Sequence, residues 1–400
     1  MQLVEQHIIR ATSPQLEAID AASFAAKNLY NAANYLVRQS FINDQGYLNY
    51  YDVHAQMKGH EAYQALPRKV SQQVLRMLDK NWQGFFAAMK AYRADASKFR
   101  KRPGLPRYLD KTEGRYALVY TIQALSKPAL KQGIIVPSGL DIRIQTRQTC
   151  IAQVRIVPKG QFYVVEVVYE KDVEPAAVDP TLVVGIDVGL NNLAAITSNK
   201  PGFVPVLVNG RPLKYINQGY NKRRAELQAK LGQPGRTKRM ERLTTRRTRQ
   251  IDHYLHTHSR RIIDLLVAEG IGTLVIGKND GWKQEISIGR RNNQNFVQVP
   301  HARFIQMLSY KAELVGIQVI LVNESHTSKC SFLDDEPVQH HEHYAGRRIK
   351  RGLLRAADGR SVINADVNGA YNIIRKAIPG AFGQGKAGVV VHPVGSAPTH

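Results

Sequence analysis

Residues 182–196 read LVVGIDVGLNNLAAI, and this stretch carries the clearest indication of the fold. Its first five residues are apolar or glycine and mostly β-branched, a pattern typical of a strand buried on both faces. Asp187 stands at the end of that run. A carboxylate at the exit of a buried strand is costly unless a positive group satisfies it. The stretch therefore predicts a buried strand that delivers an acid to a site with a cationic partner.

Two later segments repeat this buried-strand pattern. TLVIG (273–277) and QVILVNE (318–324) alternate with helical patterns after VVGID (183–187), which predicts an α/β layer with some parallel strands. The intervening residues 211–266 are rich in arginine and lysine and predict a helical hairpin. Because the sign of its charge is nearly uniform, we favour contact with a nucleic-acid backbone over a merely solvated helix face.

The N-terminal half has a different pattern. The first nine residues predict a strand, and residues 13–98 predict helices because apolar side chains recur at every third or fourth position. KFRKRPGLPRYLDK (98–111) breaks that pattern with two prolines and dense positive charge, as a basic linker does. From 115 to 174 apolar and polar residues alternate, which predicts antiparallel strands, and the Pro/Ala stretch 174–181 predicts a second linker.

The charge balance points to a polyanionic partner. The chain has 56 Lys+Arg against 32 Asp+Glu, a formal net charge of +24. Such an excess opposes compaction by self-repulsion, and nucleic acid is the leading partner, with an anionic membrane as the competitor. No apolar run approaches the ~20 residues that span a bilayer, and the N-terminus lacks a signal-peptide core. Two cysteines build neither a disulfide framework nor a four-cysteine zinc site. We therefore expect a cytoplasmic, nucleoid-associated protein.

An aspartate that ends the first strand of an α/β layer has two well-known uses. One is metal ligation in an RNase H-like nuclease, and the other is the phosphate site of actin/Hsp70-type ATPases. The ATPase interpretation needs further Gly-rich phosphate loops, and none fits. The nuclease interpretation needs further acids, because two cations ~4 Å apart require several oxygen ligands. In INADVNGAYNIIRKAI (363–378) Asp366 opens a predicted helix, where a plain N-terminal cap worth ~1 kcal/mol is the alternative role.

Four motifs together resemble a known family: KNWQGFFAAMKAY (80–92), FRKRPGLPRY (99–108), VVGIDVGLNNLAAITS (183–198) and NADVNGAYNI (364–373). The chain resembles, over nearly its whole length, the TnpB proteins of bacterial insertion sequences, relatives of type V CRISPR nucleases and of Fanzor proteins. The resemblance implies an α/β fold with β-barrel-like and helical parts, in which a split RNase H-like (RuvC) domain cuts DNA selected by a guide RNA. The first and third catalytic acids of that family fall on Asp187 and Asp366.

The resemblance also implies a division into domains. A split, wedge-like β domain is expected over 1–12 and 112–178, and a helical recognition domain with the basic linker over 13–111. The RuvC nuclease domain is expected over 179–400, with the helical hairpin 211–266 and a degenerate zinc-ribbon-like loop 325–362. In that loop only Cys330 remains of the usual cysteines, and the nearby histidines match no ordinary zinc spacing. We expect no zinc there.

The middle acid departs from the common family pattern. The usual glutamate follows the strand TLVIG, where this chain has Lys278, and a lysine repels magnesium. Glu324 ends QVILVNE, the neighbouring strand, about one strand spacing of ~4.8 Å away. A relocated glutamate is a feature of Fanzors and of a subset of TnpBs, and NESHTSKCSFLD (323–334) resembles that subset. We therefore predict Glu324 as the middle acid; a lysine-blocked, inactive site is the alternative.

The predicted cofactors are two Mg²⁺ ions, held by Asp187, Glu324 and Asp366, and a guide RNA of the omega type. The predicted partner is double-stranded target DNA with a short flanking motif, which Arg68 and Gln72 would read through bidentate contacts to base edges. Further nucleic-acid contacts are predicted along the linker and the late basic loop, at Arg100, Lys101, Arg102, Arg107, Arg347, Arg348, Lys350 and Arg351.

The sequence thus predicts an RNA-guided, magnesium-dependent DNA endonuclease encoded by or derived from a transposable element. Base pairing would supply most of the specificity. Two other functions stay open: a nuclease-inactive, RNA-guided DNA-binding repressor, suggested by Lys278, and a DNA transposase that acts without RNA.

Overall fold

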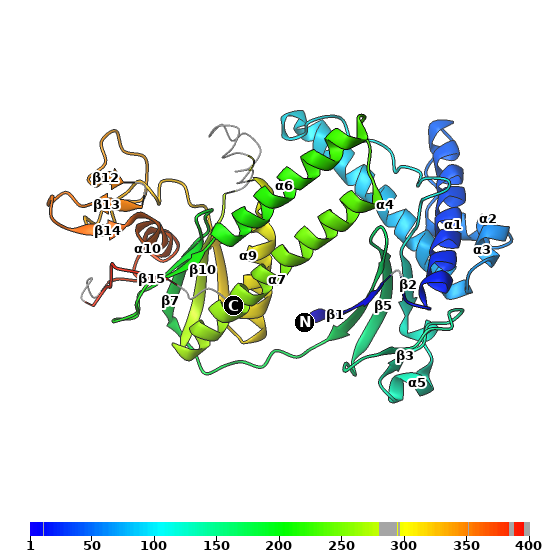
Figure 1. Cartoon of the computed structure of the whole chain (residues 1–400), viewed down its shortest axis with the longest axis horizontal. Coiled ribbons are helices and arrows are strands. Elements are labelled where there is room, and N and C mark those ends of the chain that lie inside the picture. Colours follow the sequence, from blue (N-terminus) through cyan, green and yellow to red (C-terminus); the bar gives the residue numbers. More distant parts are fainter. Residues whose placement is uncertain (11, 280–293, 295–296, 351, 384–387, 396–400) are drawn as a thin grey trace. The chain divides into compact units, whose positions relative to one another are not determined.

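A computed structural model describes residues 1–10, 12–279, 294, 297–350, 352–383 and 388–395 of the chain. The chain is a mixed α/β protein that divides into two compact units, Met1–Lys171 and Asp172–His400 (Figure 1). The boundary precedes the Pro/Ala stretch predicted as a linker. The finer division of the first unit into a β domain and a helical domain stays a prediction.

The first unit contains a helical part and a small sheet. Its helices are α1 Leu16–Ile42, α2 Tyr50–Met57, α3 Glu61–Gln64, α4 Arg68–Ala94 and α5 Lys127–Lys131, with 3-10 turns at Ala96–Lys98 and Ile122–Ala124. Its strands are β1 Gln2–Ile9, β2 Leu118–Thr121, β3 Ile134–Ile135, β4 Ile144–Gln145, β5 Ile151–Pro158 and β6 Tyr163–Glu170. Four of them form an antiparallel sheet in the order β1-β6-β5-β2, and β3 pairs with β4. The first strand of the chain therefore pairs with a strand of the 115–174 region.

The helices of this unit follow from their apolar spacing. Helices α1 and α4 pack against each other and bury Ala26, Leu29, Ala33, Val74 and Trp82 in one core. The Trp82 indole donates its N–H to Oδ1 of Asn34 at 3.1 Å, so this buried polar pair is satisfied. The prediction of helices over residues 13–98 is confirmed.

The second unit is built on a six-stranded sheet. Its strands are β7 Asp179–Asp187, β8 Asn192–Ser198, β9 Val206–Asn209, β10 Ile271–Gly277, β11 Gln318–Val322, β12 Arg347–Lys350, β13 Leu353–Arg355, β14 Val362–Asn364 and β15 Val394–Gly395. Its helices are α6 Arg211–Leu231, α7 Lys238–Ala268, α9 His301–Leu314 and α10 Ala365–Ala377. The large sheet has the order β11-β10-β7-β8-β9-β15, and β12, β13 and β14 form a separate antiparallel sheet.

Helices cover both faces of the large sheet. On one face Val184, Ile186 and Leu274 share a core with residues of α7 and α9. On the other face Val183 and Val275 share a core with α10. Side chains alternate across a strand, so this arrangement explains why β7 reads as apolar at nearly every position. Strands β7, β10 and β11 are parallel, as the alternation of strands and helices predicted.

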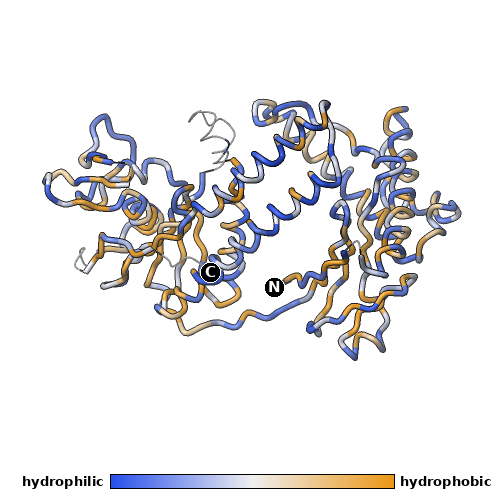
Figure 2. Tube along the Cα trace, in the orientation of Figure 1, coloured by the Kyte–Doolittle hydropathy of each residue, from blue (hydrophilic) through white to orange (hydrophobic). Residues whose placement is uncertain are grey.

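The arginine-rich segment forms the predicted helical hairpin. Helices α6 and α7 pack on each other, and the turn between them begins at Gly232, whose φ of 70° suits glycine. Figure 2 shows α6 and much of α7 as predominantly hydrophilic, in contrast to the strands of the sheet. Within the described ranges, every helix is too short or too polar to cross a lipid bilayer.

Two local predictions were wrong. Within residues 115–174, which were predicted as antiparallel strands, residues 140–147 form only the two-residue strand β4, and Lys127–Lys131 form the short helix α5, which was not predicted. Strand β11 ends at Val322, so Glu324 follows the strand and does not terminate it. The second difference matters for the site, because Glu324 belongs to a connection that can turn towards the neighbouring strands.

Candidate functional site

The ends of three parallel strands bring the first acids together. In the register of the sheet Ile186 of β7 lies beside Ile276 of β10, and Gly277 of β10 lies beside Val322 of β11. Asp187 ends β7, and Glu324 follows β11 by two residues. The carboxyl ends of parallel strands meet at one edge of a sheet, where α/β proteins commonly bind ligands. Asp187 and Glu324 therefore approach this edge from the two sides of β10.

Helix α10 brings the third acid to the same edge. It packs on β7, and a Cβ atom added to Gly369 would lie 2.7 Å from Oδ2 of Asp187. The N-cap of this helix is Asn364, whose Oδ1 accepts the backbone N–H groups of Asp366 at 3.0 Å and Val367 at 3.2 Å. The alternative role of Asp366 as the helix cap is thus wrong. Its carboxylate is available to the site because Asn364 performs the capping.

Two asparagine side chains donate hydrogen bonds to Asp366 and Glu324. Asn192, at the start of β8, donates its amide N–H to Oδ2 of Asp366 at 2.7 Å. Asn279 donates to Oε1 of Glu324 at 3.2 Å, and its own Oδ1 accepts the backbone N–H of Glu324 at 3.1 Å. Each carboxylate therefore has one oxygen fixed by an amide. The other oxygen of Glu324, Oε2, is buried and accepts no hydrogen bond from the residues that the structure describes.

The pKa values of Asp187 and Glu324 are raised. Burial, together with the charges of Glu324 and Asp366, raises the pKa of Asp187 to about 8, and the positive charge of Arg348 opposes this shift. Burial raises the pKa of Glu324 to about 7. A carboxylate cluster that is this unfavourable when ionised is typical of a cation site, where the ion supplies the missing positive charge.

Lys278 does not occupy the site. Its backbone N–H donates to Val322 at 2.8 Å and so extends the pairing of β10 with β11 by one bond. Its side chain is exposed. Side chains alternate along a strand, so Lys278 lies on the face of the sheet opposite to that of Gly277. Gly277 is the residue that contacts Glu324. Lys278 is thus exposed at the end of β10, at the position where the sequence comparison above expects an acid.

The donor set suits magnesium, which prefers carboxylate oxygens. The buried, unpartnered oxygen of Glu324 and the raised pKa of Asp187 both favour a cation. Among the described residues, however, no three His, Cys, Asp or Glu side chains are grouped closely enough to hold a single ion.

The predicted basic linker is fastened to α1 along its backbone. Side chains of this helix donate to linker carbonyls: Asn34 and Arg38 to Pro106 at 3.1 and 2.8 Å, and Asn31 to Leu109 at 2.9 Å. The side chains of the predicted contact residues Arg100, Lys101, Arg102 and Arg107 are all exposed. The linker thus presents its positive charges to solvent from a fixed backbone.

Arg68 and Gln72 lie one turn apart at the start of α4. Both make side-chain hydrogen bonds to Tyr63, which also contacts Nε2 of His54 at 3.1 Å. The structure therefore brings these two predicted base-reading residues together, with Arg68 exposed and Gln72 half-buried.

The late basic residues lie on β12. Arg347, Arg348 and Lys350 are exposed, and Arg348 lies close enough to Asp187 to lower its pKa against the larger effect of burial. This strand therefore brings positive charge towards the acids. Arg351 lies outside the described residues.

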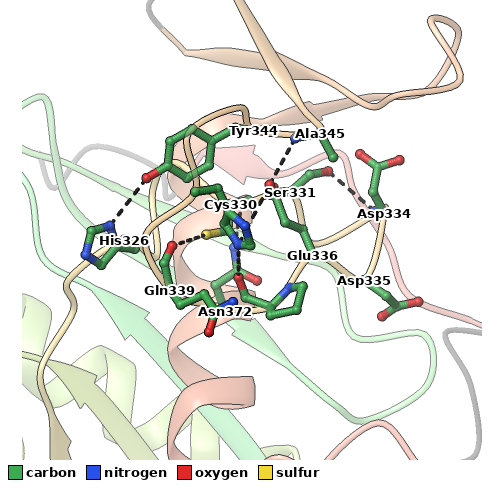
Figure 3. Close-up of polar contacts among 12 residues, drawn as sticks. His326, Cys330, Ser331, Asp334, Asp335, Glu336, Gln339, Tyr344, Ala345 and Asn372 are labelled. Atoms are coloured by element: carbon green, nitrogen blue, oxygen red, sulfur yellow. Dashed lines mark hydrogen bonds and ion pairs between the residues drawn. The ribbon is translucent and has the colours of Figure 1, made fainter.

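The loop predicted as a degenerate zinc ribbon is held by hydrogen bonds (Figure 3). Glu336 is buried and accepts the backbone N–H groups of Ser331 at 2.7 Å and Ala345 at 2.9 Å. The Cys330 thiol donates to the carbonyl of Gln339 at 3.4 Å, and Asn372 of α10 donates to the carbonyl of Cys330 at 2.8 Å. These contacts join the loop to the helix that carries Asp366.

Sequence reasoning missed the residues that hold the acids. Asn192, Gly277 and Asn279 have no periodicity or spacing that marks them, although each stands within five residues of a predicted acid or of Lys278. Their position next to a strand end was the available signal.

Comparisons with known proteins cover both parts of the site. The family model described as "Probable transposase" (OrfB_IS605) matches residues 166–283, and the model described as "Cas12f1-like, TNB domain" matches residues 301–373. The first segment contains Asp187, and the second contains Glu324 and Asp366.

Curated relatives match over parts of their length. The chain is 30% identical over 152 residues to the CRISPR-associated endodeoxyribonuclease Cas12f1 of Sulfoacidibacillus thermotolerans, covering 37% of this chain and 32% of that protein. It is 24% identical over 236 residues to the TnpB-like protein ORF457 of Acidianus two-tailed virus, covering 56% and 46%. The matched regions thus span between about a third and a half of these relatives.

A solved structure of the mini-RNA-guided endonuclease CRISPR-Cas_phi3 has a similar fold. Its TM-score is 0.50 at 9% identity, and the alignment covers 94% of this chain and 92% of that one. This likeness concerns the fold alone. The domain matches and the TnpB-like and Cas12f relatives agree with the motifs around Asp187 and Asp366, and they support the resemblance to the TnpB family.

Proposed function

We propose that this chain is an RNA-guided DNA endonuclease whose RNase H-like (RuvC) site lies at the carboxyl ends of β7, β10 and β11. The single observation that carries the proposal is the convergence of Asp187, Glu324 and Asp366, which lie on three distant segments, at one edge of the sheet. Burial and the charges of the other two acids raise the pKa of Asp187 to about 8, so this cluster needs a cation.

The three carboxylates would hold two Mg²⁺ ions. Bound magnesium supplies an activated water for attack on a phosphodiester and stabilises the departing oxygen. The residues of the chain do the rest: Asn192 and Asn279 orient the outer carboxylates, and Arg348 offers positive charge for a DNA phosphate beside Asp187.

The partners proposed are a guide RNA and double-stranded DNA. The curated relatives are named as CRISPR-associated endodeoxyribonucleases and a TnpB-like protein. In this chain the exposed arginines of the linker and the predominantly basic hairpin α6–α7 would hold nucleic acid by its backbone, without reading sequence. Arg68 and Gln72 would read the short flanking motif.

The test begins with the chain purified with its bound RNA. That RNA is sequenced, and plasmids carrying the matching target behind a randomised flank are incubated with the complex and Mg²⁺. We expect target-dependent cleavage by the wild type, none by Asp187→Ala, and DNA binding retained in that variant. Loss of DNA binding together with cleavage in Asp187→Ala would count against the site.

A nuclease-inactive, RNA-guided repressor is the second candidate. Lys278 at the usual place of the middle acid favours it, as does the lack, among the described residues, of three acids close enough for one ion. A repressor would bind the target and leave it uncut whether residue 324 is Glu or Gln, whereas the nuclease loses cleavage only in Glu324→Gln. RNase treatment separates both from a transposase, whose strand joining would survive it.

A further inference from the structure

Glu324 can reach Asp187 only by crossing β10. The sheet order is β11-β10-β7, so the two acids follow strands that are not neighbours, and adjacent strands are ~4.8 Å apart. Whether Glu324 can face Asp187 therefore depends on the residues at the carboxyl end of β10, because this strand lies between β11 and β7.

Gly277 leaves the space that Glu324 fills. A Cβ atom at Gly277 would lie 2.8 Å from Oε2 of Glu324, 3.2 Å from its Cβ, and 2.6 Å from Cδ1 of Ile373 on α10. Gly277 is not among the glycines with positive φ, so its backbone would accept another residue. Glycine is needed here for space: the carboxylate of Glu324 lies directly over it.

Asn279 fixes the direction of that carboxylate. It contacts Glu324 twice, through the backbone N–H at 3.1 Å and through Oε1 at 3.2 Å. With Oε1 held by the amide, the buried Oε2 is the oxygen turned to Gly277 and left for a cation. The two contacts order a side chain that otherwise has three freely rotating torsions.

We propose that Gly277 and Asn279 are positioning residues that form a seat for Glu324 and allow an acid beyond β11 to act in the place left by Lys278. The inference rests on the proposed function and deepens it. It identifies the end of β10 as the feature that determines where the middle acid of this site can lie.

The test measures metal binding apart from cleavage. Mn²⁺ is titrated into the full-length chain with its co-purified RNA, and bound ion is followed by electron paramagnetic resonance. Loss of a partner that orients a metal ligand typically costs 10- to 100-fold in affinity. We therefore expect Mn²⁺ to bind roughly 10- to 100-fold more weakly to Asn279→Ala and to Gly277→Ala than to the wild type. The Mg²⁺ concentration for half-maximal cleavage should rise by a similar factor.

Matched controls separate positioning from general damage. Gly272 lies at the start of β10, at the opposite end of that strand from Gly277, and the Cβ atom in Gly272→Ala would lie 2.6 Å from the backbone of Asp179 on β7. Asn199→Ala removes comparable contacts at the opposite end of β7, to Val183 at 2.7 Å and Thr181 at 3.0 Å. Both should keep Mn²⁺ affinity even where they lower the melting temperature.

A double variant separates the clash of the new Cβ atom with α10 from its clash with Glu324. Gly277→Ala combined with Ile373→Val removes the Cδ1 contact but keeps the conflict with the Glu324 carboxylate. Recovered melting temperature with Mn²⁺ binding still weakened supports the seat, and recovery of both overturns it.

Two further outcomes distinguish a wrong site assignment from a wrong seat for Glu324. If Glu324→Gln leaves Mn²⁺ binding at the wild-type level, Glu324 is no ligand, and both the site assignment and the seat are wrong. If Glu324→Gln weakens binding while Asn279→Ala and Gly277→Ala match the wild type, only the seat is wrong.

Discussion

Asn192 donates a hydrogen bond of 2.7 Å to Asp366, although 174 residues separate the two in the chain. Asn192 begins β8, directly after the turn that follows Asp187, and Asp366 lies in the first turn of α10. The bond therefore links the segment of the first acid to the third acid and fixes one oxygen of Asp366. Neither residue contributes to the apolar core, and in the proposed site this contact would orient the Asp366 carboxylate.

Asn192→Ala should impair the site without unfolding the unit. With its oxygen released, the Asp366 carboxylate can turn away, and we expect cleavage to need roughly 10-fold or more additional Mg²⁺. Asn192→Asp should be worse, because a fourth carboxylate repels Asp366. Cleavage rates over a Mg²⁺ series measure this, with Asn199→Ala as control. An unchanged Mg²⁺ requirement in Asn192→Ala would show that the bond is incidental.

Asp187→Asn should stabilise the metal-free protein at neutral and mildly alkaline pH. The folded-state pKa of Asp187 is raised to about 8, whereas the unfolded value is ~3.9. The folded state therefore holds this proton more tightly, and stability from Asp187 is present below about pH 4 and is lost as pH rises towards 8. Asparagine resembles the neutral acid and avoids that loss. We expect the free energy of unfolding of the variant to be higher by at least ~1 kcal/mol, which corresponds to about one pKa unit.

Melting temperatures in EDTA at pH 5 and pH 8 check the sign. The advantage of Asp187→Asn over the wild type should be larger at pH 8 than at pH 5. Added Mg²⁺ should raise the melting temperature of the wild type and leave the variant nearly unchanged. A variant less stable than the wild type at pH 8 in EDTA would contradict the raised pKa.

Glu336→Ala should destabilise the loop over α10. The substitution leaves the buried N–H group of Ser331 and the N–H group of Ala345 without their acceptor, at a cost of ~1–3 kcal/mol. Glu336→Gln keeps an amide oxygen and should cost less. Urea unfolding measures both, and Glu342→Ala, an exposed acid of the same loop, is the control. Equal midpoints for Glu336→Ala and Glu342→Ala would argue against the contacts in Figure 3.

Replacing Arg100, Lys101 and Arg102 together by alanine should weaken RNA binding and flatten its salt dependence. For a single strand, each charge that neutralises a phosphate adds ~0.7 to the slope of log K against log salt, so the slope should fall by up to ~2 units when three such charges are removed. A triple variant of the exposed Lys58, Lys127 and Lys159 removes the same charge elsewhere. Filter binding at several salt concentrations compares the two, and equal slopes would mean that the linker acts only through net charge.

Releasing the linker tests whether its attachment matters. Asn31 holds the backbone of Leu109 twice, because its amide N–H donates to the Leu109 carbonyl and its Oδ1 accepts the Leu109 N–H, both at 2.9 Å. In Asn31→Ala the charges of the linker remain, but this attachment is lost. We expect weaker RNA binding with an unchanged salt slope, a combination that removal of the arginines does not produce.

Much of the layout followed from the chain alone. The apolar runs at 183–187 and 273–277 predicted parallel strands, and the nearly uniform charge of 211–266 predicted the helical hairpin; both are confirmed. These features are local, because strand and helix periods are written in neighbouring residues. The motifs around Asp187 and Asp366 likewise predicted the family. The roles of Asp187, Glu324 and Asp366 stay predictions until metal binding and cleavage are measured.

What only the tertiary structure decided is how a glutamate beyond β11 can face an aspartate at the end of β7. That depends on Gly277 leaving room above β10, on Asn279 and Asn192 holding carboxylates across strands, and on Lys278 lying exposed. The strand and helix patterns could be predicted from the sequence because they involve residues a few positions apart. The seat of Glu324 could not, because it joins segments whose distance is set by strand order and packing, which no local period encodes.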